Sequence, residues 1–427
     1  MFNRASGSGN VSIERESATG GFSHMGYRVH GILVAGFFTL FAAFAVRYSY
    51  GLLLPDMLVS LAISKTEAGI IYSSYFLTYT LFSPVLGLMV DRYDARKILT
   101  LFVAILSTGT CLMAFSTTVV QASLFFALAG IGHSGCWAPV VTVVMRWVSE
   151  KRRGLAISIV DLGSAVTIAF WSIMIPLLIA PYGWRAVWVI LAVCGYLAAG
   201  TNFFLIKSHP QPTGEDNPSP APLRIPVRAA YSAILRDSRF HLIGFSYLLI
   251  SFSILIPLAF LTAYTIQELK MSYQSAAALI AVIGIAGSIG KLILGHVSDR
   301  VGRIKVMMLC GVLTATGGFG LAYAQTLAGL AIFTILFGVG YGTIWPVYAA
   351  SARDLFPKEY AGSIVGLWTI FHGLGSVLAP VLAGWTIDSS GTYFWAFMLA
   401  VSASVISLLL LFPVSATRTN RVMHSRF

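Results

Sequence analysis

The stretch Lys291-Leu-Ile-Leu-Gly-His-Val-Ser-Asp-Arg-Val-Gly-Arg303 begins inside a long apolar run and ends in a short charged loop. The run, residues 276–294, approaches the length of about 20 apolar residues that a transmembrane helix needs. A lysine at the centre of such a helix costs about 2.5–3.5 kcal/mol on insertion scales, so it tends to face a bundle interior or a wet cavity. Lys291 is therefore a candidate functional residue.

The charged loop has a counterpart 208 residues earlier in the chain, where Asp91 and Arg92 correspond to Asp299 and Arg300. The same offset relates several further residues: Gly130 and Gly338, Gly132 and Gly340, Trp137 and Trp345, Gly154 and Gly362, Gly183 and Gly391. A repeat of this kind predicts two related halves, and parallel halves are one recognised plan of transporters.

The composition places the chain in a membrane. Of its 427 residues 57% are hydrophobic and 10% charged, which is too apolar for a soluble protein. Its four cysteines lie in apolar runs without paired spacing, so we expect neither a disulfide framework nor a metal site. No phosphate-binding loop or catalytic cluster is present in the sequence, so we expect no cofactor and no enzyme activity.

We predict an all-α polytopic membrane protein with 12 transmembrane helices in two pseudo-symmetric six-helix bundles. The expected spans are residues 30–54, 68–90, 97–117, 120–145, 154–180, 184–206, 239–266, 274–298, 304–324, 327–350, 361–384 and 391–413. The bundles cover residues 28–206 and 239–413. Residues 207–238 form a linker rich in proline and arginine, residues 1–27 a disordered tail, and residues 414–427 a second tail.

The basic residues predict the orientation. If the N-terminus is cytoplasmic, all lysines and arginines fall on the cytoplasmic side except Lys65, Arg185, Lys270, Arg47 and Lys291, and the last two lie inside spans. This is the positive-inside pattern with both termini in the cytoplasm, and it predicts a multi-pass protein of the plasma membrane, the inner membrane of a bacterium. The net charge of +12 then favours anionic lipid headgroups and gives no reason to expect nucleic acid as a partner.

Two six-helix halves with Gly-x-x-x-Asp-Arg loops resemble the major facilitator superfamily over about residues 28–413. The resemblance implies two bundles that rock about a central site, which is reached alternately from each side. It also implies a cytoplasmic gate made by the charged loops. Its residues would be Asp91, Arg92, Arg96, Asp299, Arg300 and Arg303.

Three stretches resemble the monocarboxylate transporters and the oxalate/formate antiporters within that superfamily: Tyr48-Ser-Tyr-Gly51, Arg152-Arg-Gly-Leu-Ala-Ile-Ser158 and Gly290-Lys-x-x-x-Gly295. In those transporters the last stretch carries an arginine that holds the substrate carboxylate, and the matching residue here is Lys291. The aspartate thought to relay a proton in animal-type monocarboxylate transporters is replaced by Gly287. Proton symport by that route is therefore not expected.

Lys291 and His372 are the first candidates for contact with substrate. Lys291 either binds an anion or extends to the cytoplasmic headgroups as a snorkelling lysine. His372 lies in the middle of a predicted span, where it is either a hydrogen-bonded structural residue or a substrate ligand that also accepts a proton. The first half has Ser83 and Ser164 at the equivalent positions, and this asymmetry favours a substrate role.

Two further charged residues lie inside predicted spans. Arg47, beside Tyr48, is either an interfacial anchor or an outer gate that attracts anions. Asp161 either pairs with a nearby base such as Arg153 or carries a coupled proton. Aromatic residues on half-polar spans would complete a cavity. The candidates are Tyr341 and Trp345 first, then their repeat mates His133 and Trp137, then Tyr75 and Tyr79.

The sequence thus predicts a secondary transporter of a small organic anion, a mono- or dicarboxylate, that works as a monomer with protons or a counter-anion as coupled ion. Two alternatives from other classes stay open. A proton-driven efflux pump for amphipathic compounds would use the same fold with a wider, more apolar cavity. A non-transporting membrane sensor would not need the two charged loops.

Overall fold

The computed structural model describes residues 11–149, 152–207, 234–356 and 361–424, apart from the side chains of residues 11–26, 87, 88, 90–92 and 416–424. Nearly every described residue is helical. The first half holds α1 (Val11–Ser60), α2 (Lys65–Arg92), α3 (Ala95–Met113), α4 (Val119–Ser134), α5 (Trp137–Trp147) and α6 (Arg153–Leu205). The second half holds α8 (Ser238–Gln267), α9 (Tyr273–Val301), α10 (Arg303–Tyr323), α11 (Leu327–Leu355), α12 (Ala361–Ser390) and α13 (Phe394–His424).

The labelled helices depart from one helix per span in two places. The 53 residues of α6 would extend about 80 Å at 1.5 Å per residue, far more than the roughly 30 Å of a bilayer core. Gly183 breaks α6 with a φ of 73°, so α6 contains two spans, close to the predicted ranges. The fourth predicted span is instead divided into α4 and α5 at Gly135 and Cys136, a break that was not predicted.

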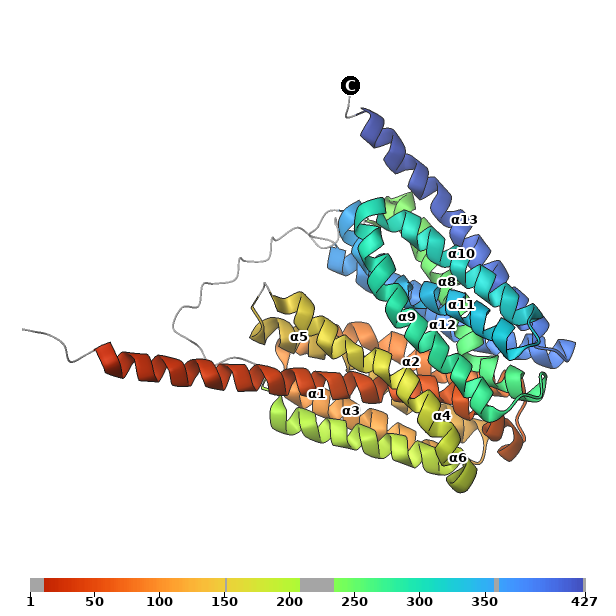
Figure 1. The fold of residues 1–427 in the computed structure, drawn as a ribbon, viewed down its shortest axis with the longest axis horizontal. Helices are drawn as coiled ribbons and strands as arrows, with labels where there is room; N and C mark the ends of the chain where they lie inside the picture. Colours follow the sequence, from red (N-terminus) through yellow and green to blue (C-terminus); the bar gives the residue numbers. More distant parts are fainter. Residues whose placement is uncertain (1–10, 150–151, 208–233, 357–360, 425–427) are drawn as a thin grey trace, which may run out of the picture.

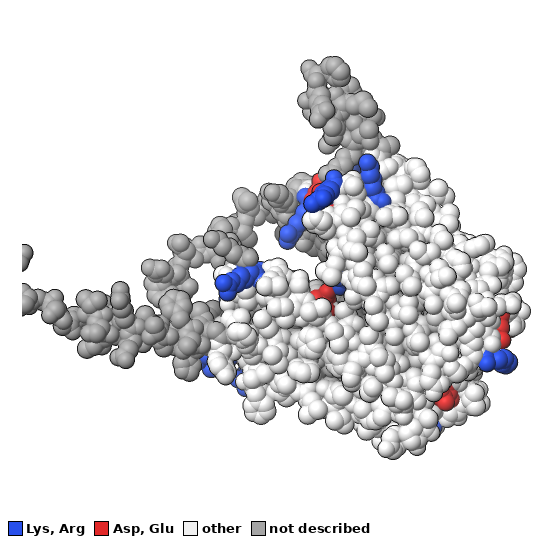
Figure 2. Space-filling model, in the orientation of Figure 1, with Lys and Arg blue, Asp and Glu red and all other residues white. Residues whose placement is uncertain are grey.

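Ten helices of the described chain are long and apolar enough to cross a membrane. One of them is α6, which counts as two spans, and α2 is not among the ten although it is 28 residues long. Residues 87, 88 and 90–92 of α2 lie outside the residues searched for spans. Figure 2 shows a broad area on the visible face that is neither acidic nor basic, with charged side chains at its margins and in one notch between two lobes.

The repeat predicted from the sequence recurs in the backbone. Gly183 and Gly391, 208 residues apart, both have a positive φ, of 73° and 74°. Ala62 and Lys270 are another such pair, with φ of 52° and 56°. A positive φ is uncommon for residues other than glycine, so its recurrence at the same offset is strong evidence for two similar halves.

The helices of each half lie together, and the two groups diverge toward one end of the molecule (Figure 1). We call the end at which α6 ends and α8 begins the linker end, and the opposite end the far end. The two bundles contact each other through α2 and α12, α6 and α9, and α1 and α8. Functional side chains carried by these six helices therefore meet between the bundles.

Several hydrogen bonds join the bundles at the far end. The carboxylate of Asp388, near the end of α12, accepts bonds from the backbone N–H groups of Lys65 and Thr66 at 3.1 and 2.7 Å, and from the Thr66 hydroxyl at 2.6 Å. Further along the same helix pair, the hydroxyl of Ser73 donates to the carbonyl of Val377 at 2.6 Å. The far end is therefore closed by contacts between the bundles.

Candidate functional site

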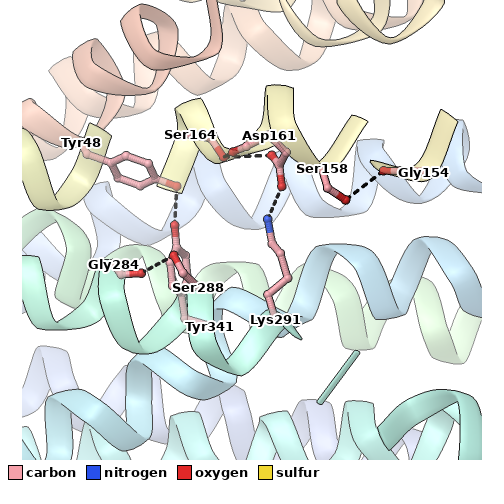
Figure 3. A network of polar contacts seen from close by, with 9 residues as sticks. All are labelled: Tyr48, Gly154, Ser158, Asp161, Ser164, Gly284, Ser288, Lys291 and Tyr341. Atoms are coloured by element: carbon pink, nitrogen blue, oxygen red, sulfur yellow. Dashed lines mark hydrogen bonds and ion pairs between the residues drawn. The ribbon is translucent and has the colours of Figure 1, made fainter. Parts of the chain in front are cut away.

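Lys291 on α9 forms an ion pair with Asp161 on α6, and this pair joins the two bundles (Figure 3). The lysine Nζ lies 2.6 Å from Oδ2 of Asp161, and Oδ1 of the same carboxylate accepts a bond from the Ser164 hydroxyl at 2.9 Å. The two charged side chains are 35% and 23% exposed. Lys291 thus reaches across to the other bundle, and a carboxylate of the protein already balances its charge.

Arg47 on α1 is buried, with 4% of its surface exposed. It is therefore not an anchor at the lipid interface, and that interpretation was wrong. Within the part of the chain that the structure describes, no carboxylate forms an ion pair with Arg47. Its Nε and one terminal nitrogen are buried without a hydrogen-bond partner. This is unusual, because buried polar groups are nearly always hydrogen-bonded.

Four aromatic rings surround the Arg47 guanidinium. Its Cζ lies 4.8 Å from the ring centre of Phe76, 5.7 Å from that of Tyr48 and 5.9 Å from that of Phe44, all in the first bundle. The fourth ring, Trp345 of the second bundle, lies at 5.7 Å. A desolvated cation–π contact contributes about 2 kcal/mol. Burying a charge costs several kcal/mol even after relaxation, and the rings offset part of that cost without supplying a hydrogen-bond acceptor for the guanidinium N–H groups.

Two hydrogen-bonded pairs of side chains complete the surroundings of Arg47. The hydroxyls of Tyr48 and Tyr341 hydrogen-bond to each other between α1 and α11, and so across the bundles (Figure 3). In the second bundle the indole N–H of Trp345 donates to Nε2 of His372 at 2.9 Å. Because Nε2 is the acceptor, a neutral His372 carries its proton on Nδ1.

On the side of the first bundle, His133 packs among aromatic residues. Its Nδ1 hydrogen-bonds to the Tyr75 hydroxyl, and its ring lies edge-on to Tyr79 at 5.2 Å and to Phe44 at 5.1 Å. Since Phe44 also touches Arg47, His133 belongs to the same cluster. The histidines and tyrosines predicted to line a cavity are thus connected to Arg47 through shared aromatic neighbours.

One predicted aromatic residue lies elsewhere. Trp137 begins α5 with a side chain that is 40% exposed, so it does not join the buried cluster. Conversely, four members of the cluster were not predicted as site residues: Phe44, Tyr48, Phe76 and Tyr247, whose ring lies 5.0 Å from that of His372. Phe44 precedes Arg47 by three residues, a spacing that places both on one helix face and could have indicated the contact.

The charged loops were predicted to form a gate, and the contacts described for them lie within single bundles. Arg303 bonds to Asp299 and to Asp354, the latter at 3.3 Å, and all three belong to the second bundle. The Arg96 guanidinium lies 4.3 Å from the ring centre of Phe203, within the first bundle. Arg300 is exposed. The side chains of Asp91 and Arg92 lie outside the described residues.

The chemistry of the cluster fits binding more than catalysis. It offers one uncompensated cation, hydroxyl and indole groups, and flat apolar surfaces. No group of three or more histidines, cysteines and acidic residues that could hold a metal ion occurs among the residues whose placement is described.

Comparisons with known proteins found related sequences and structures. A family model described as Major Facilitator Superfamily matches residues 36–303 and 243–422. A hexuronate transporter of Bacillus subtilis (strain 168) is 25% identical over 401 residues, covering 87% of this chain and 92% of that protein. Monocarboxylate transporter 12 of Xenopus laevis is 24% identical over 424 residues, covering 94% of this chain and 90% of that protein.

Solved structures share the fold. A bacterial homologue of the human lysosomal transporter Spinster, in an inward-facing and unoccupied conformation, superimposes with a TM-score of 0.77 and 16% identity, covering 92% of this chain and 97% of that one. The nucleoside transporter NupG gives a TM-score of 0.70 and 17% identity, covering 90% of this chain and 98% of that one.

Proposed function

This chain belongs to the major facilitator superfamily of membrane transporters, and on that premise we propose that it carries a small organic anion, a mono- or dicarboxylate, by exchange against a second anion. The observation that carries the proposal is the buried guanidinium of Arg47, which lies between the bundles without an acidic partner among the described residues. An arginine presents several N–H donors in one plane, a geometry that suits two-point binding of a carboxylate.

The position of Arg47 supports a role in alternating access. The rings over its guanidinium come from both bundles, and the hydroxyls of Tyr48 and Tyr341 meet between them. A carboxylate bound here touches both bundles at once, so its affinity changes whenever they rock. A ligand can shift a conformational equilibrium only through such a difference in affinity.

The uncompensated charge favours exchange over proton symport. When both ends close around an empty site, Arg47 is a buried charge without a partner, which typically costs about 3–5 kcal/mol. A bound carboxylate removes that cost in both directions of travel, so the loaded carrier changes conformation faster than the empty one. His372 gives no free proton acceptor at Nε2, because the Trp345 indole already occupies it.

The names of relatives agree with an anionic solute. A hexuronate and a monocarboxylate each carry a carboxylate group. The same cation disfavours an exporter of lipophilic cations, because two positive charges would then share a site of low dielectric constant. Lys291 is proposed to hold the bundles together through Asp161, and to leave the carboxylate to Arg47.

The experiment is counterflow in proteoliposomes, with labelled lactate and labelled glucuronate as probes. We expect accumulation of one of them only when the lumen contains an unlabelled carboxylate, and none with Arg47→Gln. The control is Lys270→Asn, which changes an exposed far-end residue with a positive φ to one that tolerates that conformation. Equal uptake into empty vesicles under a pH gradient would contradict exchange.

A further inference from the structure

A pocket at the linker end, far from Arg47, combines basic and apolar side chains in its lining. It has a volume of about 590 Å³ and lies between residues 27–32 of α1 and the ends of α5 and α6. Its rim carries Arg28 and Lys207, and its walls include Trp147, Phe204 and Ile32. The Trp147 indole donates to the carbonyl of Lys207 at 2.7 Å, which fixes the wall against the end of the first bundle.

The helix lengths place this pocket at the level of lipid headgroups. The last span of α6, residues 184–205, is about 33 Å long and just crosses a hydrocarbon core of roughly 30 Å. Phe204 therefore lies at the boundary of the hydrocarbon, and Lys207 lies just beyond it. The pocket has apolar walls toward the acyl chains and basic groups toward the headgroups. Tryptophan is enriched at this depth, as Trp147 is here.

The two basic side chains are free to bind a ligand. Within the described ranges neither Arg28 nor Lys207 uses its side chain in a hydrogen bond or an ion pair. None of the eight lining residues is acidic. A lipid with a net negative headgroup is favoured here, because the ammonium group of a zwitterionic lipid would approach two cations.

We propose that this pocket binds one anionic phospholipid, with its phosphate between Arg28 and Lys207 and its acyl chains along Phe204. Basic pockets between transmembrane helices are suited to such headgroups, and each basic residue near an anionic surface contributes about fivefold in affinity. The site is independent of the transported anion, because none of its lining residues is Arg47 or one of the four aromatic residues around the Arg47 guanidinium.

The test is native mass spectrometry of the full-length protein in detergent, titrated with phosphatidylglycerol, phosphatidylcholine or inorganic phosphate. We expect one tightly held phosphatidylglycerol, with weak retention of phosphatidylcholine and none of phosphate. The double variant Arg28→Gln/Lys207→Gln should bind phosphatidylglycerol about 30-fold more weakly, the product of two such contributions. Phe204→Glu should weaken binding as well, because it replaces an apolar wall with a negative charge beside the acyl chains. The variant should still fold, since the Phe204 ring is 79% exposed and its loss leaves the core packing intact.

The matched control is Lys305→Gln/Arg353→Gln, which removes the same charge from two exposed residues at the linker end of the second bundle. It should leave the affinity for phosphatidylglycerol unchanged. Equal weakening in both double variants would show a general charge effect and overturn the proposal. So would tight binding of phosphatidylcholine, or displacement of the lipid by inorganic phosphate.

Discussion

Nζ of Lys291 and Oδ2 of Asp161 lie 2.6 Å apart although the two residues belong to different bundles. The pair lies on α9 and α6, on the linker-end side of the interface that the bundles share. Rocking of the bundles must change this distance, because each residue is fixed to its own helix. The pair is therefore a contact between the moving parts, in contrast to the contacts of Arg303 within one bundle.

Reversing the ion pair tests this role. Lys291→Ala and Asp161→Ala should each slow exchange of a labelled carboxylate in proteoliposomes, because charges in contact are typically coupled by about 0.5–3 kcal/mol. The swapped variant Asp161→Lys/Lys291→Asp should recover most of the rate. A different result would contradict this role: the swapped variant is as inactive as Lys291→Ala, while Asp161→Ala transports normally. Lys291 would then act by binding the substrate and not by pairing with Asp161.

Binding of the anion should depend on a hydrogen-bond acceptor for the Trp345 indole at position 372. His372→Gln keeps a side-chain oxygen that can accept from the indole, whereas His372→Ala leaves the half-buried indole N–H without this partner at a cost of up to about 1–3 kcal/mol. We expect KM for the anion to rise strongly with alanine and little with glutamine. Equal loss in both variants, together with a changed pH profile, would instead indicate that the imidazole takes up a proton.

Asp388 should keep the far end closed. Removing its carboxylate in Asp388→Ala breaks its three bonds to Lys65 and Thr66, and a hydrogen bond to a charged group typically contributes about 1.5–3 kcal/mol. A cysteine at Ser73, in a background with the native cysteines replaced by serine, should then react faster with a membrane-impermeant thiol reagent. Asp354→Ala, which loses a bond within one bundle, is the control and should not change that rate.

A single methyl group should open the same interface. A Cβ at Gly69 would meet the carbonyl oxygen of Pro380 in the other bundle at 2.2 Å, so Gly69→Ala is expected to separate the far ends of α2 and α12. Gly366, also helical, has nothing within 4 Å of such a Cβ. Gly366→Ala should leave the labelling rate at Ser73→Cys unchanged. Normal labelling in Gly69→Ala would show that this close contact does not control closure.

The sequence was sufficient to predict the architecture, because the spans and the repeat both leave a pattern that can be recognised along the chain. Apolar runs mark the spans, and the offset between Asp91 and Asp299 reveals the repeat that the backbone then confirms at Gly183 and Gly391. The break between α4 and α5 was not predictable in this way. Gly135 follows α4 and Pro139 lies in the first turn of α5, but both stand inside an apolar run long enough for one span.

The site was predictable as a set of residues but not as a set of contacts. Lys291 and Asp161 are 130 positions apart, and no local pattern links them. Burial excludes Arg47 as an anchor at the lipid interface, and burial of one helix face depends on how the bundles meet. The sequence therefore identified the cations correctly as unusual, while only the structure distinguishes the one with a partner from the one without.

The most direct test of a carboxylate site at Arg47 is equilibrium binding of a labelled carboxylate to purified wild-type protein, Arg47→Gln and Lys291→Ala. Loss of a hydrogen bond to a charged group costs about 1.5–3 kcal/mol, so Arg47→Gln should weaken binding by about 10- to 150-fold. Lys291→Ala should bind with nearly wild-type affinity. Wild-type binding by Arg47→Gln, with loss of binding in Lys291→Ala, would contradict the assignment of the carboxylate to Arg47.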